Sequence, residues 1–587
     1  MAARIDWFLR SGFAVAVILG IYATLVLPTL NHLGIGWDEQ TDFGIALSYS
    51  AEPGGWLIGS DIDPVNVRLP MAASAVWFKI FAPELEAARA LACVLGAFTL
   101  VAVIAFCRRE LDARKAFVAG LLLATSPYFL AYSKSAFSDG DAFITCAIAT
   151  LLASLAYLRK ERSLGWGAIT AVALGAALAS KISAVAAIPA IAITLLFPAR
   201  DEHTREKTLS SSAWTALVTL LALLYATVFG GWEVGKRLAS GPYESAGLGF
   251  LALHAGLVVG LWIAVLIASW RHRRERPSRG KLTAFVLVLG GMTFFALPPL
   301  HTTNPDVFNS LIGAFLFSNV ESPLMFALEA AALHFAVIAI KPSLLIGVCA
   351  WLGVVVAAVR VRTRPELRLP LLFIACYLLF LLRLPWAQTF YMLPVFPPLA
   401  ILLADMGVEL FDRRRGAAVT LAFLAITLLG VDLARSHPDY HLNGYQWVGA
   451  SVWGGRPTIG ARSLVQVPAD GAEQALRWVD AHAQPGETVV TFVRPWHIIA
   501  ATIPKPDYAL ENGLDDPGAI ARGDYVVTTL GAEIQHGYGM DDPTDVWAVP
   551  YDRERLERDF TRVHSERRAF DLEVAAVWQR KRAEPLR

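Results

Sequence analysis

Apolar blocks long enough to cross a bilayer recur through most of the chain. A helix needs roughly 20 apolar residues to span the hydrocarbon core. Of 587 residues, 55% are hydrophobic and 17% are charged, whereas a soluble protein carries about 25% charged residues. The chain is therefore predicted to contain an all-α polytopic membrane domain over residues 1–433, with about thirteen transmembrane helices. The blocks lie near 12–30, 86–106, 116–132, 142–158, 165–179, 184–198, 213–230, 248–270, 282–300, 343–359, 369–384, 389–404 and 416–433.

Basic residues concentrate in every second loop between these blocks. They occur at 108–115, 159–162, 200–207, 271–281, 360–364 and 413–415. Because short loops rich in Lys and Arg stay in the cytoplasm, the N-terminus is predicted to be cytoplasmic and residues 434–587 to lie outside the plasma (inner) membrane. The net charge is only +1, so the protein has no overall positive field that would favour binding of nucleic acid.

The composition changes after residue 432. A helix is predicted at 472–483, and strands at 488–493, 524–529, 546–549 and 572–579. Strands alternating with helices predict a small extracytoplasmic α/β domain over 434–587. Two long outer loops, 31–85 and 301–341, have compositions suited to short interfacial helices. The five cysteines lie in or beside apolar blocks without a CxxC pair, so we expect neither a disulfide framework nor a cysteine metal site.

Carboxylates cluster at the predicted outer face. Asp38 and Glu39 follow the first block closely, and Asp139 and Asp141 precede the fourth. Taken singly, Asp38 and Glu39 could instead cap a helix that follows them, and Asp139 is a good N-cap candidate for the fourth block. Together they favour chemistry, since one carboxylate can deprotonate a hydroxyl acceptor while a second group orients it or holds a cation. Asp139 and Asp141, with Asp38, are also candidate oxygen ligands for a divalent cation such as Mg, Mn or Ca.

Other polar residues lie near the same face. Lys181 stands between two apolar runs, where a lysine can bind a phosphate as a point charge; the alternative is a lysine that reaches the interface without a ligand. His301 and Asn304 follow the ninth block and Arg68 lies in the first outer loop. We consider these three as candidates for lining a substrate cavity.

These elements together resemble the GT-C superfamily of membrane glycosyltransferases, in particular the branch of protein O-mannosyltransferases and lipid A aminoarabinose transferases. The resemblance covers most of residues 1–435. It is carried by Trp37-Asp38-Glu39, by the Lys134 to Asp139 segment, by Lys181 after a Gly/Ala/Ser-rich run, and by Phe390-Tyr391-Met392-Leu393-Pro394.

The resemblance implies an enzyme of the EC 2.4 class. It would transfer a monosaccharide from a polyprenyl-phosphate donor to a hydroxyl of a glycan, lipid or protein at the outer face, with inversion. By position, Asp38 matches the catalytic acid, with Glu39 beside it, and Asp139 matches the second acidic position. Phosphate is a good leaving group, so one base with electrostatic help for the departing phosphate suffices. The donor phosphate would meet Lys181, Lys134 and Tyr391.

The sequence also departs from the family pattern. The family often has Pro-Pro-Leu or His-Pro-Pro in the first loop, whereas this chain has Val67-Arg68-Leu69-Pro70. Lys134 stands where arginine is common, and Asp141 is an additional carboxylate. Because of these differences, the sequence does not identify the sugar donor, and it leaves room for a bound divalent cation. The sequence contains no Trp-Trp-Asp-Tyr-Gly segment, which argues against an oligosaccharyltransferase catalytic subunit.

Two other functions compete with this prediction. A transporter or flippase of lipid-linked sugars would show two related halves with broken helices in corresponding places, and the sequence shows no such doubling. An assembly protein would bind a partner through its outer α/β domain, whose aromatic candidates are Tyr445, Trp447, Trp453 and Trp496.

Overall fold

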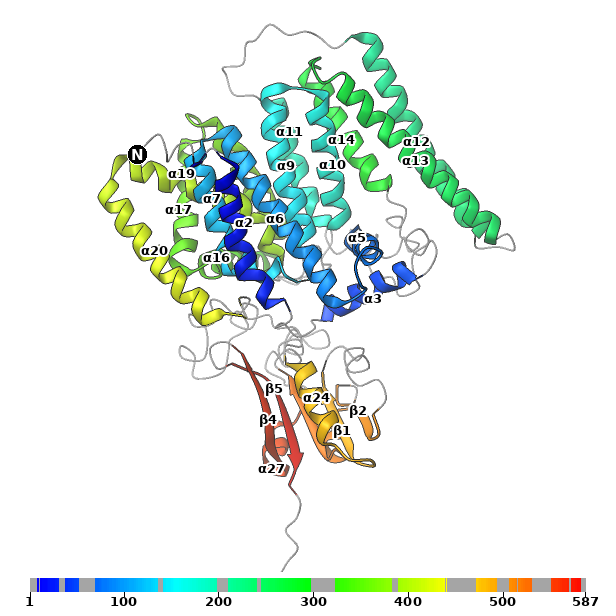
Figure 1. The fold of residues 1–587 in the computed structure, drawn as a ribbon, viewed down its shortest axis with the longest axis vertical. Helices are drawn as coiled ribbons and strands as arrows, with labels where there is room; N and C mark the ends of the chain where they lie inside the picture. Colours follow the sequence, from blue (N-terminus) through cyan, green and yellow to red (C-terminus); the bar gives the residue numbers. More distant parts are fainter. Residues whose placement is uncertain are drawn as a thin grey trace, which may run out of the picture.

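A helical bundle and a mixed β-sheet domain make up the protein (Figure 1). The computed structural model describes residues 8–9, 11–30, 37–51, 69–135, 141–197, 210–239, 244–296, 323–382, 389–438, 440, 471–493, 506–514, 516–529, 551–568 and 572–581. The predicted strand at 546–549 lies outside these residues.

Helices occupy the positions of the predicted apolar blocks. Within the described residues, six helical stretches are long and apolar enough to cross a membrane, and five shorter apolar helices accompany them. The chain is a multi-pass integral membrane protein, and the total of about thirteen spans stays a prediction. The bundle contains α2 (Gly12–Val26), α6 (Leu85–Glu110), α7 (Ala113–Ala124), α8 (Pro127–Tyr132), α9 (Asp141–Glu161), α10 (Leu164–Ser180), α11 (Ala187–Leu196), α12 (Ser211–Ala239), α13 (Glu244–Arg271), α14 (Arg279–Ala296), α17 (Leu344–Arg360), α18 (Arg368–Leu381), α19 (Phe396–Arg413) and α20 (Arg415–Ser436).

Short 3-10 segments adjoin several of these helices. They are η1 (Leu27–Thr29), η2 (Ile182–Ala186), η4 (Pro365–Leu367) and η5 (Thr389–Val395). The third predicted block is broken between α7 and α8 because Pro127, at the first position of α8, has no backbone N–H. The twelfth block begins as η5 and continues as α19.

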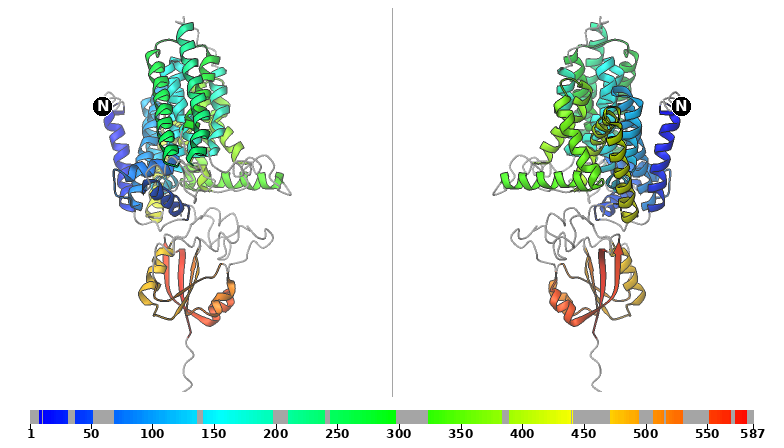
Figure 2. Two further views of the ribbon diagram at one scale, coloured as in Figure 1. Left: turned by 90° about the vertical axis from the view of Figure 1, so that its right-hand side faces the viewer. Right: turned by 90° about the vertical axis from the view of Figure 1, so that its left-hand side faces the viewer.

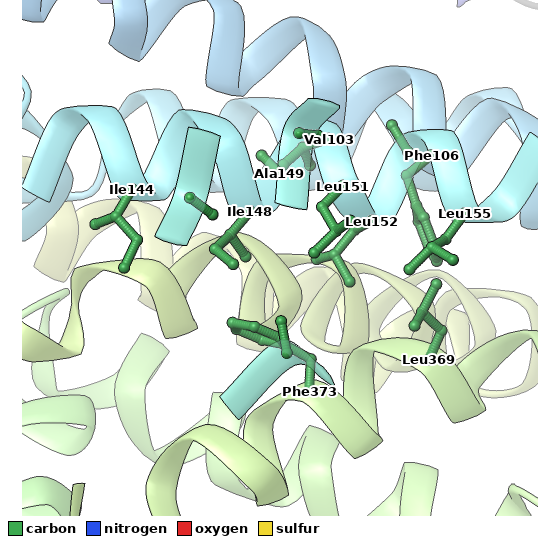
Figure 3. Close-up of a cluster of buried hydrophobic side chains, with 14 of the residues drawn as sticks. Val103, Phe106, Ile144, Ile148, Ala149, Leu151, Leu152, Leu155, Leu369 and Phe373 are labelled. Carbon is green, nitrogen blue, oxygen red and sulfur yellow. The ribbon is translucent and has the colours of Figure 1, made fainter. Parts of the chain in front are cut away.

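Part of the core of the bundle lies where α6, α9 and α18 come together. Figure 3 shows Ile144, Ile148 and Leu152 of α9 on the side facing Phe373 of α18, and all four side chains are buried. Small residues let other helices approach closely, as is usual in membranes. A Cβ atom added to Gly175 of α10 would lie 2.4 Å from Cβ of Thr293 and 2.7 Å from the carbonyl oxygen of Gly290, both on α14.

The two ends of the bundle differ in charge. The basic end carries the loops with the arginine and lysine clusters, and acidic partners there tie separate helices together. The ammonium of Lys115 lies 2.6 Å from the Asp405 carboxylate, and Arg364 lies 3.0 Å from the same group. Arg114 pairs with Asp412 at 2.9 Å. Buried charges at this end are thus paired, as burial requires.

The opposite end, here called the site end, is covered by helices from the two long loops. The first loop contains α3 (Trp37–Ala51) and α5 (Leu69–Phe78), and α16 (Pro323–Ile340) begins within the second. Ile45 and Tyr49 of α3 pack with Met71 and Phe78 of α5. Figure 2 shows α16 running roughly perpendicular to the bundle helices at this end and projecting to one side of the bundle, and the sheet domain lies beyond this end (Figures 1 and 2).

The C-terminal domain is a five-stranded mixed sheet with helices on both faces. Its strand order is β2-β1-β3-β5-β4, with β1 parallel to β2 and β3, and β5 antiparallel to β3 and β4. Leu476 and Val479 of α24 pack on one face, and Leu556 of α27 packs on the other. The predicted α/β domain is confirmed. Its elements are α24 (Ala472–His482), β1 (Thr488–Phe492), β2 (Ala509–Asn512), β3 (Tyr525–Thr529), α27 (Arg553–Asp559), β4 (Phe560–Arg568) and β5 (Leu572–Arg580).

Candidate active site

The predicted catalytic acids lie at the starts of helices or outside the described residues. Asp38 and Glu39 are in the first turn of α3, which begins at Trp37, and Asp141 is the first residue of α9. The side chains of these three lie outside what the structure describes, so their grouping stays a prediction. Among the side chains that it does describe, no group of three His, Cys, Asp or Glu could hold a metal. Arg68, Asp139, His301 and Asn304 lie outside the described residues.

Lys181 lies at a break between two helices, as the sequence suggested. Its backbone is extended (φ −163°, ψ 137°), so α10 ends at Ser180 and η2 follows directly. Its ammonium lies 3.9 Å from the centre of the Tyr391 ring, which η5 presents. The hydroxyls of Ser183 and Tyr377 are 3.0 Å apart and fasten η2 to α18. The structure thus brings together two of the three residues predicted to meet the donor phosphate.

An apolar groove of about 930 Å³ has Ser180, the residue before Lys181, in its lining. Its walls include Val172 and Ala176 of α10, with Trp262 and Leu266 of α13. The groove extends from Ser180, the chain neighbour of Lys181, to residues at the basic end, including Gly165 and Arg271. Its lining therefore runs along α10 from Gly165 to Ser180, a length of about 23 Å, which is most of a hydrocarbon core about 30 Å thick.

Lys134 lies in a different set of contacts. It follows α8 and its side chain is fully buried. Its ammonium donates to the Thr29 hydroxyl at 3.0 Å and to the Pro438 carbonyl oxygen at 2.8 Å. The ammonium also lies 5.1 Å from the centre of the Tyr440 ring. These contacts join the ends of α2, α8 and α20 at the site end.

Sequence reasoning missed two further buried cations, Arg89 in α6 and Lys341 between α16 and α17, both 2% exposed. The guanidinium of Arg89 donates to the Leu30 carbonyl oxygen at 2.7 Å. The signal that could have found them is a positive charge at the edge of an apolar block, because such charges are rare and usually engaged.

Comparison with known proteins bears on the helical part of the chain. Residues 69–232 match the family model of dolichyl-phosphate-mannose-protein mannosyltransferases, a segment of less than half of the chain that contains Lys134 and Lys181. No curated protein matches the sequence.

Solved structures give weaker likenesses. The apo oligosaccharyltransferase of Archaeoglobus fulgidus is 14% identical, with a TM-score of 0.48 over 99% of this chain and 76% of that one. ArnT from Cupriavidus metallidurans bound to undecaprenyl phosphate is 14% identical, with a TM-score of 0.31 over 96% of this chain and 97% of that one. At these scores the assignment rests on the family match. That match confirms the resemblance read from the sequence: residues 69–232 are similar to the membrane glycosyltransferases of the dolichyl-phosphate-mannose-protein mannosyltransferase family.

Proposed function

We propose that the protein transfers a monosaccharide from a polyprenyl-phosphate donor to a hydroxyl acceptor at the outer face of the membrane, with inversion at the sugar. The observation that carries this proposal is the Lys181–Tyr391 pair together with an apolar groove that runs along α10 from Gly165 to Ser180, the residue before Lys181. Such a groove suits a long isoprenoid tail, and a lysine that directly follows Ser180 in the chain suits the phosphate to which that tail is attached.

The lysine is held in place before the donor arrives. The face of the Tyr391 ring attracts the ammonium, a cation–π contact worth about 0.5–2 kcal/mol. Lys181 also follows the C-terminus of α10, where the helix dipole favours a positive charge. A charge that is already oriented needs little rearrangement as negative charge develops on the departing phosphate, so it favours the transition state.

In the proposed reaction, Asp38 takes the proton of the acceptor hydroxyl. The acceptor oxygen then bonds to the anomeric carbon while the bond from that carbon to the phosphate oxygen breaks. The polyprenyl phosphate leaves with the bonding electron pair, and Lys181 balances its added charge. Glu39 and Asp139 would orient Asp38. Asp38, Asp139 and Asp141 have the oxygen ligands that a divalent cation prefers, and titration of activity with Mg, Mn, Ca and a chelator tests that role.

The topology belongs to the same proposal. We place the N-terminus in the cytoplasm and residues 434–587 outside, in agreement with the alternation of basic loops. The acceptor then approaches from outside and can be a glycan, a lipid or a protein. A cysteine introduced at the exposed position Asp507 of the α/β domain should react with a membrane-impermeant maleimide in intact spheroplasts.

The decisive experiment uses the full chain in proteoliposomes with a panel of polyprenyl-phosphate sugars. Release of polyprenyl phosphate and labelled product are measured for the wild type, Asp38→Asn and Asp507→Asn. We expect Asp38→Asn to abolish transfer while the protein stays folded and inserted. The matched control Asp507→Asn makes the same chemical change on the sheet domain and should keep full activity. Normal activity in Asp38→Asn would refute the mechanism, and lipid movement without sugar transfer would support a flippase.

A further inference from the structure

Lys134 connects three segments that are far apart in the sequence. It lies just after α8, while Thr29 is the last residue of η1 and Pro438 follows α20. Its buried ammonium donates to the Thr29 hydroxyl at 3.0 Å and to the Pro438 carbonyl oxygen at 2.8 Å. Hydrogen bonds from a charged donor are stronger than neutral ones, and a buried lysine is costly without them.

Tyr440 makes a second connection between the same segments. Its hydroxyl donates to the Leu25 carbonyl oxygen at 3.3 Å, near the end of α2, and lies 2.9 Å from Nδ1 of His437. Burial raises the pKa of Tyr440 to about 12, so the hydroxyl keeps the proton that it donates at physiological pH. The chain that leaves α20 toward the sheet domain is therefore fastened to the end of α2 by Tyr440 as well as by Lys134.

Arg89 holds the next residue of the same segment. Its buried guanidinium donates to the Leu30 carbonyl oxygen at 2.7 Å. Thr29 and Leu30 are consecutive, and Asp38 follows Leu30 by eight residues. Two buried cations, one on α6 and one after α8, thus fix the chain shortly before the residue proposed as the base.

We propose that Lys134 is a positioning residue: it fastens the segment leading into Asp38 and the segment leading into the sheet domain at one point. The inference rests on the proposed role of Asp38 as the base. It gives Lys134 a part in the reaction that differs from binding the donor phosphate, because its ammonium already donates to the Thr29 hydroxyl and to the Pro438 carbonyl oxygen. A displaced base slows the chemical step, whereas donor binding at Lys181 is left intact.

The kinetic signature follows from that distinction. A misplacement of about 1 Å in a catalytic group can cost about 100-fold in rate. We expect Lys134→Met to lower kcat by about 10- to 100-fold and to leave the KM for the donor within about two-fold, as for loss of an interaction realised only in the transition state. Lys134→Arg keeps a charged donor and should restore part of kcat. Lys281→Met makes the same change at the basic end and should leave both constants unchanged.

Two milder variants cover the case in which Lys134→Met does not fold. Thr29→Val removes one acceptor of Lys134 with little change of shape, and Tyr440→Phe removes the hydroxyl that reaches Leu25. Each should lower kcat at constant donor KM, and the double variant should lose less than the product of the two single losses, because both act through one junction.

The outcomes separate this inference from the proposed function. A large rise in donor KM with unchanged kcat in Lys134→Met would make Lys134 a phosphate ligand and overturn the positioning role. Wild-type kcat in Thr29→Val and Tyr440→Phe would overturn it too. If Asp38→Asn is inactive while these variants keep full kcat, only the positioning role fails. If Asp38→Asn itself is active, the proposed function fails first.

Discussion

Lys181 lies with its ammonium 3.9 Å from the centre of the Tyr391 ring, although the two residues belong to distant parts of the chain. Lys181 directly follows α10, and Tyr391 lies in the 3-10 segment that precedes α19. The contact orients a positive charge at the break after α10. It also makes the phosphate site testable residue by residue.

Replacing Lys181 should weaken donor binding and slow the reaction together. A hydrogen bond to a charged group is worth about 1.5–3 kcal/mol, so we expect Lys181→Ala to lower kcat/KM for the donor by about 10- to 100-fold. Lys181→Arg should keep much of the activity because it keeps the charge. Initial rates at varied donor content measure this, with Lys281→Ala at the basic end as the control. Equal kcat/KM in Lys181→Ala and in the wild type would contradict the phosphate site.

Filling the groove should exclude long donors selectively. Ala176 lines the groove one helical turn before Ser180, and tryptophan at this position would occupy the groove near Ser180. We expect Ala176→Trp to lose activity with long polyprenyl donors and to keep activity with short-chain analogues. Ala222→Trp, on the exposed side of α12, is the control for an added tryptophan. Equal losses with both donor lengths would show that the tail does not lie there.

The crossing of α10 and α14 should not tolerate a side chain at Gly175. An added Cβ atom would lie 2.7 Å from the Gly290 carbonyl oxygen, so the two backbones must separate. Overpacking costs about 1–3 kcal/mol, and Gly175→Val should lower the midpoint of thermal unfolding in detergent. Gly291→Val is the matched control, because a Cβ atom added there meets nothing within 4 Å. An unchanged midpoint for Gly175→Val would contradict the close crossing.

The buried pair Lys115–Asp405 should matter for stability at the basic end. The two groups are 2.6 Å apart, with side chains 9% and 3% exposed. Removing one partner of a buried pair costs about 3–5 kcal/mol because it leaves a charge unpaired. Asp405→Asn should therefore unfold at a lower temperature, whereas Asp412→Asn, in a more exposed pair with Arg114, should change little. Similar midpoints of thermal unfolding for Asp405→Asn and Asp412→Asn would contradict the prediction that the buried pair contributes more to stability.

Hydropathy located the membrane helices, because apolar length is a direct requirement of the bilayer. The break at Lys181 was also visible, since a cation interrupts two apolar runs. In the sheet domain, the apolar strands β1, β3 and β5 were predicted, but β2 and β4 were not. β4 is an edge strand whose sequence, FTRVHSERR, is mostly charged or polar, as edge strands often are. β2 is four residues long and contains no β-branched residue.

The candidate site was predicted less completely than the fold. The resemblance placed Lys181 and Tyr391 together at the donor phosphate, but it did not predict their direct contact, because packing between distant helices decides it. It grouped Lys134 with them, whereas the structure surrounds Lys134 with Thr29, Pro438 and Tyr440. Arg89 was not recognised as a buried cation because it lies near Glu84 and Glu86. Charged residues are common at the polar end of a membrane-spanning helix, so one more did not stand out.

The groove between α10 and α13 has a consequence for how substrate arrives. Among its lining residues, Ile267 and Trp270 are 63% and 53% exposed, so the groove opens sideways toward the surrounding lipid. A donor lipid would then enter by lateral diffusion and never pass through water. Turnover would depend on the number of donor molecules per unit area of the outer leaflet, and diluting the vesicles at fixed lipid composition would leave the rate per enzyme unchanged.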